Sequence, residues 1–260
     1  MDSVAHSIIL GILQAITEFL PISSSAHLTI LPYFAKWQYQ GLGFDVALHF
    51  GSLVGVLFYF RKDWIEIIGS AFSKVKKDNS NMLWFLVLAT VPGALAGLFL
   101  EGYAETIFRN PRLIATTLIA FALILYAADK KSAKNENAKF DLKSALLIGL
   151  FQAMAIVPGV SRSGITITVA LILGFTRNKS AKISFLLSTP IILGAVLFEF
   201  KNFTPSQINP ALIIGFLASA VTSWLAIKFL LNFVKKHPFN IFVIYRIILG
   251  ICIVIFSLIK

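Results

Sequence analysis

Two stretches of this chain, residues 11–27 and 149–164, repeat the same arrangement of residue types. Each is an apolar run that contains a Gln-Ala pair and continues through a Pro into a Ser-x-Ser cluster. The first stretch also carries Glu18, and the second carries Arg162. Apolar segments that Pro or Gly interrupts at corresponding positions point to a site where two structural repeats meet. The sequence therefore predicts one polar site that is assembled from both stretches.

The composition places the chain among the integral membrane proteins. Of its 260 residues, 57% are hydrophobic and only 13% are charged, and the mean hydropathy is +0.83. A soluble domain of this length does not need so much apolar surface. The formal net charge of +11 would suggest nucleic acid as the partner of a soluble protein. In a membrane protein it fits basic cytoplasmic loops, so we expect no nucleic-acid partner.

Six further apolar segments are long enough, or nearly so, to cross a hydrocarbon core, which takes roughly 20 helical residues. They are residues 43–60, 82–100, 112–128, 183–198, 211–227 and 241–259. We therefore predict an all-α integral membrane protein with six transmembrane helices.

The distribution of Lys and Arg predicts the orientation of these spans. Segments 61–81, 129–143, 176–182 and 228–240 carry five, five, three and three of the 23 basic residues, and the other connections and ends together carry five. Positive charge collects in short cytoplasmic loops, so we assign these four segments to the cytoplasm. Both chain termini are then expected on the outer side of the membrane.

This orientation leaves two pieces, about residues 7–35 and 144–175, that each begin and end on one side of the membrane. Each consists of two apolar arms of about 12–14 residues around a polar turn, which is too short for two ordinary spans. We interpret both as re-entrant helical hairpins in a single membrane domain, 1–260. The first repeat is 1–128 and the second is 144–260; each is a hairpin plus three spans, in an inverted-topology repeat.

The first hairpin combines several polar groups. Gln14 and Glu18 are four residues apart and share one helix face. The run Ser23-Ser24-Ser25 then begins a new helix, whose free N–H groups and positive dipole attract an anion. Ser residues at such a turn are equally compatible with simple capping. His27 lies three residues after Ser24 on the same face.

The second hairpin offers donors suited to phosphate. Arg162 presents a planar fork of N–H groups, and Gly159 lets the backbone approach a ligand closely. Ser161, Ser163 and Thr166 add hydroxyl groups. An internal ion pair between Arg162 and Glu18 is the structural alternative, and such a pair is compatible with function.

Three further polar residues lie in apolar segments. Asp45 and His49 are four apart and either support the site or pair with each other. We expect Arg246, in the last span, to neutralise a carboxylate such as Asp45 or Glu18 rather than to contact substrate.

Together the two turns predict phosphoryl transfer on a lipid phosphate, because that chemistry depends on charge neutralisation and positioning. Ser24 or His27 would attack phosphorus, and Glu18 would accept a proton or hold a divalent cation. Arg162 would hold the anion. The predicted substrate-binding residues are Gln14, Ser23, Ser25, Gly159, Ser161, Ser163 and Thr166.

The polar turns of the two predicted hairpins resemble motifs of the undecaprenyl pyrophosphate phosphatase family, and two further segments resemble the same family. The family motif Glu/Gln-x-x-x-Glu, running into Phe-Leu-Pro-x-Ser-Ser, matches residues 14–24, and Pro-Gly-x-Ser-Arg-Ser-x-x-Thr matches residues 158–166 without a break. Further likeness lies in residues 44–51 and 245–250, and the resemblance covers the whole chain.

The resemblance implies removal of the terminal phosphate from undecaprenyl pyrophosphate, which leaves the monophosphate carrier used in cell-wall synthesis. It also implies dependence on a divalent cation, Mg²⁺ or Ca²⁺, and a place in the bacterial plasma (inner) membrane, with an active site that opens to the outer (periplasmic) face. Proposals for the family's nucleophile differ between the residues matching Ser24 and His27. We expect Ser24 to attack, with His27 as an acid or base. Gln14 stands where many members have a second Glu, and a neutral amide cannot act as a base and binds cations more weakly. Glu18 is therefore the main metal-ligand candidate, with Gln14 as the second.

The alternative function is a secondary transporter or flippase for a lipid phosphate, because inverted repeats with re-entrant hairpins are typical of transporters. A homodimer is also compatible with the sequence.

Overall fold

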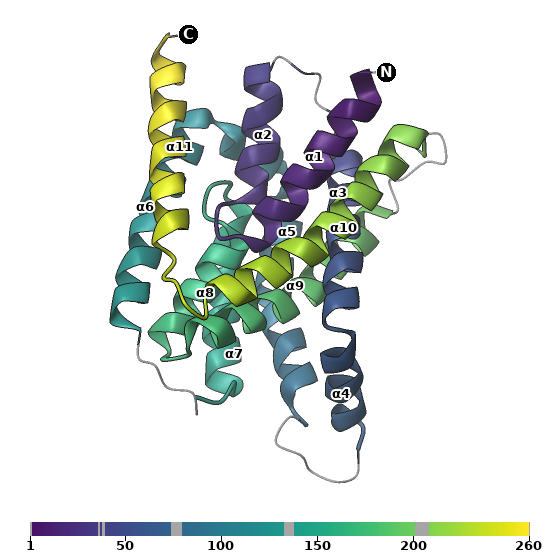
Figure 1. Cartoon of the computed structure of the whole chain (residues 1–260), viewed down its shortest axis with the longest axis vertical. Helices are drawn as coiled ribbons and strands as arrows, with labels where there is room; N and C mark the ends of the chain where they lie inside the picture. Colours follow the sequence, from purple (N-terminus) through teal and green to yellow (C-terminus); the bar gives the residue numbers. More distant parts are fainter. Residues whose placement is uncertain are drawn as a thin grey trace.

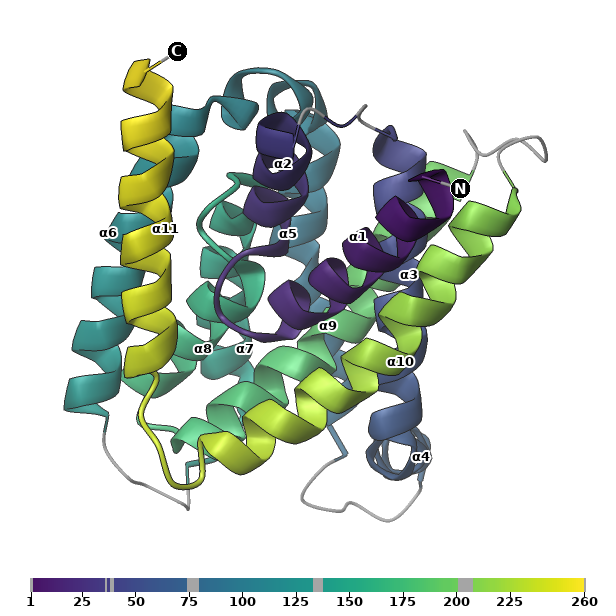
Figure 2. The same ribbon diagram turned by 45° about the horizontal axis from the view of Figure 1, so that its top comes forward.

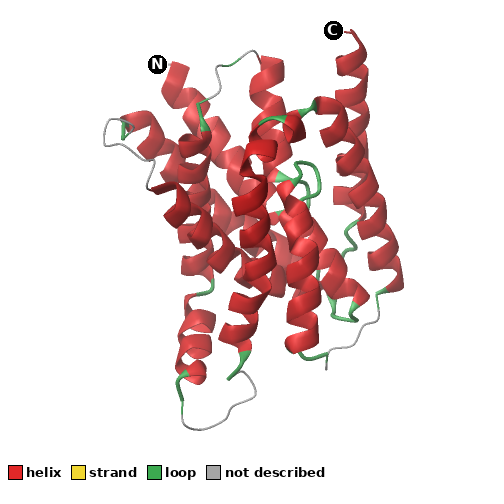
Figure 3. Cartoon of the chain, turned by 180° about the vertical axis from the view of Figure 1, so that it is seen from behind, coloured by secondary structure: helices red, strands yellow, loops and turns green. Residues whose placement is uncertain are grey.

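The computed structural model describes residues 2–35, 37, 40–73, 80–132, 138–200 and 208–259. These residues form α-helices and two short 3-10 helices, without a β-strand in the described part (Figure 3). The helices are α1 (Asp2–Phe19), α2 (Ser24–Ala35), α3 (Leu42–Tyr59), α4 (Arg61–Ala71), α5 (Met82–Glu105), η1 (Ile107–Arg109), α6 (Pro111–Lys131), α7 (Leu142–Gln152), η2 (Ala153–Ile156), α8 (Arg162–Ile172), α9 (Arg177–Phe200), α10 (Pro210–Phe233) and α11 (Asn240–Ile259).

The predicted apolar spans fall on the long helices. Among the described residues, α5, α6, α9, α10 and α11 are long and apolar enough to cross a membrane. Helices α3 and α4 form a sixth candidate, which is bent by 77°. The chain is therefore a multi-pass membrane protein whose described secondary structure is all helical, which confirms the predicted class.

Local sequence signals explain where several helices begin. Asn110 and Asn209 precede Pro111 and Pro210, and each Asn side chain accepts a hydrogen bond from the backbone N–H two or three residues later. Pro is well tolerated at the first helical position, where its missing N–H costs nothing. Asp141 caps α7 in the same way by accepting from the N–H of Ser144 at 2.8 Å.

Helix α4 is an addition to the predicted elements, because the charge count treats residues 61–81 as a connection. Its polar residues are interleaved with apolar ones, and Ile67 packs inward. Asp63 forms an ion pair with Lys182 of α9, which ties α4 to the bundle. The helix lies at the end of the molecule opposite both chain termini (Figure 1).

Two short helix pairs bring polar turns into the middle of the bundle. The turn between α1 and α2 lies about half-way along the height of the long helices, beside α8 and α9 (Figure 2). The turn between η2 and α8 meets it there: the Gly159 N–H donates to Ser23 Oγ at 3.0 Å, and Ser163 Oγ donates to the Leu20 carbonyl at 3.1 Å. The arm formed by α1, with 18 residues, is longer than the predicted arms because the helix begins at Asp2 and includes residues of mixed polarity before the apolar run.

Close backbone contacts hold these pairs against long helices. A Cβ atom on Gly11 of α1 would lie 2.3 Å from the carbonyl oxygen of Gly215 in α10, and one on Gly149 of α7 would lie 2.5 Å from that of Ala89 in α5. Real Cβ contacts are never this short. Glycine is therefore required at both crossings.

Candidate active site

The polar turn between α1 and α2 places Glu18 and Ser24 side by side. Helix α1 ends at Phe19, and Pro21 follows in the turn. Ser23 then adopts a positive φ of 77°, which is uncommon for a residue with a Cβ atom. Helix α2 begins at Ser24, so the side chains at the end of one helix and at the start of the next face each other.

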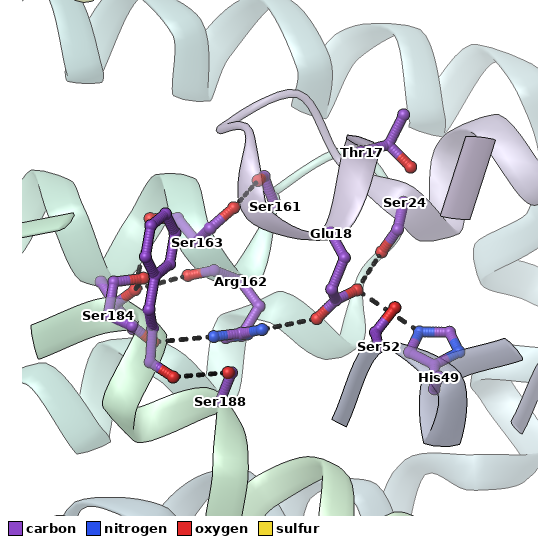
Figure 4. A network of polar contacts seen from close by, with 12 residues as sticks. Thr17, Glu18, Ser24, His49, Ser52, Ser161, Arg162, Ser163, Ser184 and Ser188 are labelled. Atoms are coloured by element: carbon purple, nitrogen blue, oxygen red, sulfur yellow. Dashed lines mark hydrogen bonds and ion pairs between the residues drawn. The ribbon is translucent and has the colours of Figure 1, made fainter. Parts of the chain in front are cut away.

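Glu18 is the centre of the polar network in Figure 4. Its Oε2 accepts a hydrogen bond from Ser24 Oγ at 2.7 Å and one from Gln14 Nε2 at 3.2 Å. Its Oε1 accepts from Arg162 Nη2 at 2.5 Å. His49 Nε2 of α3 lies 3.5 Å from Oε2. The carboxylate is buried, with an exposed fraction of 6%, and Ser24, His49 and Arg162 are half-buried.

Arg162 begins α8, in the position relative to its turn that Ser24 has in the first turn. Ser161 before it also has a positive φ, 71°, and its hydroxyl caps α8 by accepting from the Gly164 N–H at 3.1 Å. Besides the bond to Glu18, Arg162 Nη1 donates to the Ser184 carbonyl at 2.9 Å. These contacts occupy two of the five N–H donors of the guanidinium, so Arg162 retains donors for a ligand.

His27 is held by its own turn and by α11. Its Nδ1 lies 2.7 Å from the Ser23 carbonyl, and its Nε2 lies 2.6 Å from the hydroxyl of Tyr245 in α11. A carbonyl only accepts, so Nδ1 carries the proton, and Nε2 of the neutral ring then accepts from Tyr245. The two rings are stacked with centroids 5.7 Å apart.

Some of the other predicted binding residues hold the two turns together, whereas Ser25 and Thr166 make different contacts. Gly159 donates its N–H to Ser23, and Ser163 donates to Leu20, as described above. Ser25 Oγ lies 3.4 Å from Ser23 Oγ. Thr166 Oγ1 lies 2.7 Å from Ser184 Oγ of α9.

The prediction that Arg246 neutralises a carboxylate is wrong. Its fully buried guanidinium donates instead to carbonyl oxygens of Leu118 at 3.2 Å, Pro21 at 3.3 Å, Gly159 at 2.7 Å and Val160 at 3.1 Å. Turns leave carbonyl groups without helical partners, and such groups must be satisfied when they are buried. Arg246 therefore joins both polar turns to α6.

Tyr245 is missing from the predicted site, and His49 is predicted there only as one of two alternatives, support of the site or pairing with Asp45. In the structure its Nε2 lies beside Glu18, and its Nδ1 lies 2.7 Å from the Asp45 carbonyl. The signal that could have found both is their position: each is a polar ring within an otherwise apolar span.

The side-chain oxygen of Gln14 suits a divalent cation at this site. The Gln14 Oε1 atom is buried and has no hydrogen-bond donor, and it belongs to the residue that contacts Glu18. An orphaned amide oxygen beside a carboxylate suits Mg²⁺ or Ca²⁺, which bind oxygen ligands, and Mg²⁺ is often bound by one or two carboxylates with substrate phosphates. Among the described residues there is no cluster of three or more His, Cys, Asp and Glu that could hold a metal alone.

Comparisons with known proteins agree with the family resemblance that the sequence motifs indicate. Residues 7–252 match the family model described as bacitracin resistance protein BacA. The chain is 53% identical to the undecaprenyl-diphosphatase of Elusimicrobium minutum over 255 residues, which covers 98% of each chain. It is 48% identical to that of Pelotomaculum thermopropionicum, covering 98% of this chain and 97% of the relative. It is 46% identical to that of Desulforudis audaxviator, covering 98% of each.

Proposed function

This chain belongs to the bacitracin resistance protein BacA family, and on that premise we propose that it hydrolyses undecaprenyl diphosphate to undecaprenyl phosphate and inorganic phosphate. The reaction recycles the lipid carrier of bacterial cell-wall synthesis. Relatives that are up to 53% identical in sequence, and that align over 97–98% of their own length, are named for this activity. The protein would act in the inner membrane on a polyprenyl diphosphate lipid.

The hydrogen bond from Ser24 Oγ to Glu18 Oε2, at 2.7 Å, is the observation that carries the mechanism. A serine hydroxyl becomes a nucleophile when an adjacent base removes its proton. Ser24 Oγ attacks the terminal phosphorus, its proton passes to Glu18, and the bond from phosphorus to the bridging oxygen breaks. The proton leaves with the lipid monophosphate. Glu18 then takes a proton from the water that hydrolyses phosphoserine and returns it to Ser24.

Charge neutralisation in this scheme comes from Arg162 and from the start of α2. Arg162 already points at the Glu18 carboxylate (Figure 4), and its remaining donors suit the non-bridging oxygens of a phosphate. The first backbone N–H groups of α2, which begins at Ser24, have no partner within the helix and attract anions. Both groups favour the extra negative charge that develops on the transferred phosphoryl group.

His27 serves better as a positioned helper than as the nucleophile. Its Nδ1–H faces the Ser23 carbonyl, and its Nε2 lone pair accepts from Tyr245. Neither nitrogen is therefore free to attack phosphorus. Ser24, in contrast, is half-buried, and its Oγ already donates a hydrogen bond to the Glu18 carboxylate, which can act as its base. A divalent cation would be held by Glu18, Gln14 and the diphosphate, and it would neutralise phosphate charge.

The membrane arrangement that we propose is an inverted repeat with two re-entrant hairpins, α1–α2 and α7–α8. Corresponding residues support it: Ser23 and Ser161 both have positive φ, and the glycine crossings of α1 on α10 and of α7 on α5 are alike. Both termini lie at the end opposite α4 (Figure 1), which suits an outer location for the termini and for the entrance to the site.

Phosphate release from purified protein in detergent tests the function. With undecaprenyl diphosphate labelled at the terminal phosphate, we expect turnover in the wild type and a loss of more than about 10³-fold in Ser24→Ala. The control Thr29→Val, one turn further along α2, should retain activity. Rapid quenching should trap label on Ser24, and His27→Ala should lose activity partly.

Two outcomes would overturn this assignment. Full activity in Ser24→Ala, or label trapped on His27, would remove Ser24 as the nucleophile. If the protein released no phosphate in detergent but moved undecaprenyl phosphate across vesicle membranes, the transport function would replace hydrolysis.

A further inference from the structure

A groove on an exposed apolar face of the bundle runs between α3 and α10, away from the candidate active site. Its volume is about 310 Å³, and it is lined by Val54, Gly55, Phe58, Ala220, Val221 and Trp224. The floor is formed where Gly55 lets the two helices approach: a Cβ there would lie 2.6 Å from the Ala220 carbonyl oxygen. Phe58 and Trp224 are the two bulky aromatic side chains of its wall.

Two cations lie over these aromatic walls. The Arg61 guanidinium carbon is 4.9 Å from the centre of the Phe58 ring, and Lys228 Nζ is 5.2 Å from the Trp224 ring. Both cationic side chains are exposed, and within the described ranges neither has a carboxylate partner. Both belong to the connections that the charge distribution assigns to the cytoplasmic side.

The groove lies apart from the catalytic residues. Along α3, Phe58 is nine residues beyond His49, which is roughly 14 Å at the rise of an α-helix. The displacement is toward α4, the end opposite the chain termini (Figure 1). A diphosphate held by Arg162 therefore does not occupy the groove.

We propose that this groove binds an anionic phospholipid of the inner leaflet, with an acyl chain against Gly55 and Ala220 and the headgroup phosphate between Arg61 and Lys228. An apolar trough bordered by two cations that have no carboxylate partner in the described ranges has the chemistry of such a lipid, because basic residues at the membrane surface attract anionic headgroups. This proposal does not depend on the hydrolytic function.

A second copy of the chain fits this face less well. A two-fold interface brings the same patch of both subunits together. It would place Arg61 and Lys228 of each copy in one interface, with no described carboxylate of this groove to neutralise them. A phospholipid neutralises the same charges with its phosphate.

Native mass spectrometry of the full chain in detergent tests the proposal. The protein is titrated with phosphatidylglycerol and, separately, with phosphatidylcholine of the same acyl chains. Each cation near an anionic headgroup contributes about fivefold in affinity, so Arg61→Gln with Lys228→Gln should weaken phosphatidylglycerol binding roughly 30-fold. The control pair Lys62→Gln and Lys235→Gln removes equal charge from exposed positions outside the groove.

A second pair of variants tests the apolar half of the groove. Ala220→Leu fills the floor and should reduce binding of both lipids, whereas Leu217→Phe, on the exposed side of α10 outside the groove, should not. Phosphate release in lipid-free detergent should be unchanged in the Arg61 and Lys228 variant, which shows that the protein is folded.

Three results would overturn the proposal. These are equal binding of the two lipids by the wild type, equal losses in the test and control charge pairs, and dimers that disappear in the Ala220 variant without any lipid adduct. The last result would identify the groove as a contact between two copies of the chain.

Discussion

Replacing the ion pair between Glu18 and Arg162 separates its structural effect from its chemical effect. The two side chains have exposed fractions of 6% and 13%, and their charged atoms are 2.5 Å apart. Removing one partner of a buried pair leaves an uncompensated charge and destabilises a protein by about 3–5 kcal/mol. Replacing both by apolar residues of similar volume is often neutral. We therefore predict that Glu18→Met and Arg162→Met each destabilise the protein and that the double variant regains stability.

The assay is thermal denaturation in detergent, followed for the four proteins side by side. About 2–4 °C per kcal/mol is expected for a chain of this size, so each single variant should melt roughly 6–20 °C lower and the double variant within a few degrees of the wild type. Phosphate release should be absent from all three variants, because the double variant has neither the base at Glu18 nor the guanidinium at Arg162.

A matched control is the ion pair between Asp63 and Lys182, whose side chains are 31% and 44% exposed. Exposed pairs contribute about 0–1 kcal/mol, so the corresponding Met variants should change neither melting nor hydrolysis. If the double variant at Glu18 and Arg162 recovered hydrolysis together with stability, the pair would be structural only. If the single variants melted like the wild type, the pair would not hold the two hairpins together.

Tyr245→Phe removes the hydroxyl that contacts His27 at 2.6 Å. The loss of this one hydrogen bond should lower kcat about tenfold, while Tm stays near the wild-type value. An unchanged kcat would show that this contact has no part in catalysis. Gly149→Ala places a Cβ 2.5 Å from a backbone oxygen of α5 and should cost about 1–3 kcal/mol, measured as a fall in Tm that Ala at an open glycine such as Gly97 does not produce. Asp141 caps α7, and hydrogen bonds from the side chain and then the backbone of Ser144 hold its pKa below the usual value. The contribution of this cap to the stability of the folded protein is therefore complete above the ordinary carboxyl pKa. It is lost as the pH falls through the lowered pKa that Asp141 has in the folded state. Asp141→Asn should flatten the pH dependence of Tm below about pH 5, and an identical pH profile in this variant would contradict that account.

The sequence determined the parts of this protein that depend on local pattern. Apolar runs of membrane length became the long helices, and Pro21 together with the serines after it ended α1 and began α2. The spacing of Gln14 and Glu18 put both on one face of α1, where they form a hydrogen bond. Helical periodicity and turn chemistry act over a few residues, so these features follow from the chain itself.

Only the tertiary structure decided which polar groups meet. The sequence left the pairing of Glu18 with Arg162 as one of two alternatives, and it assigned Arg246 a carboxylate partner where the fold supplies carbonyl oxygens. His49 reaches Glu18, and Tyr245 reaches His27 across 218 positions of the chain. Such contacts depend on how each helix is rotated and how deeply it sits against its neighbours. Those quantities are set by the packing of side chains from distant segments, and no local pattern encodes them.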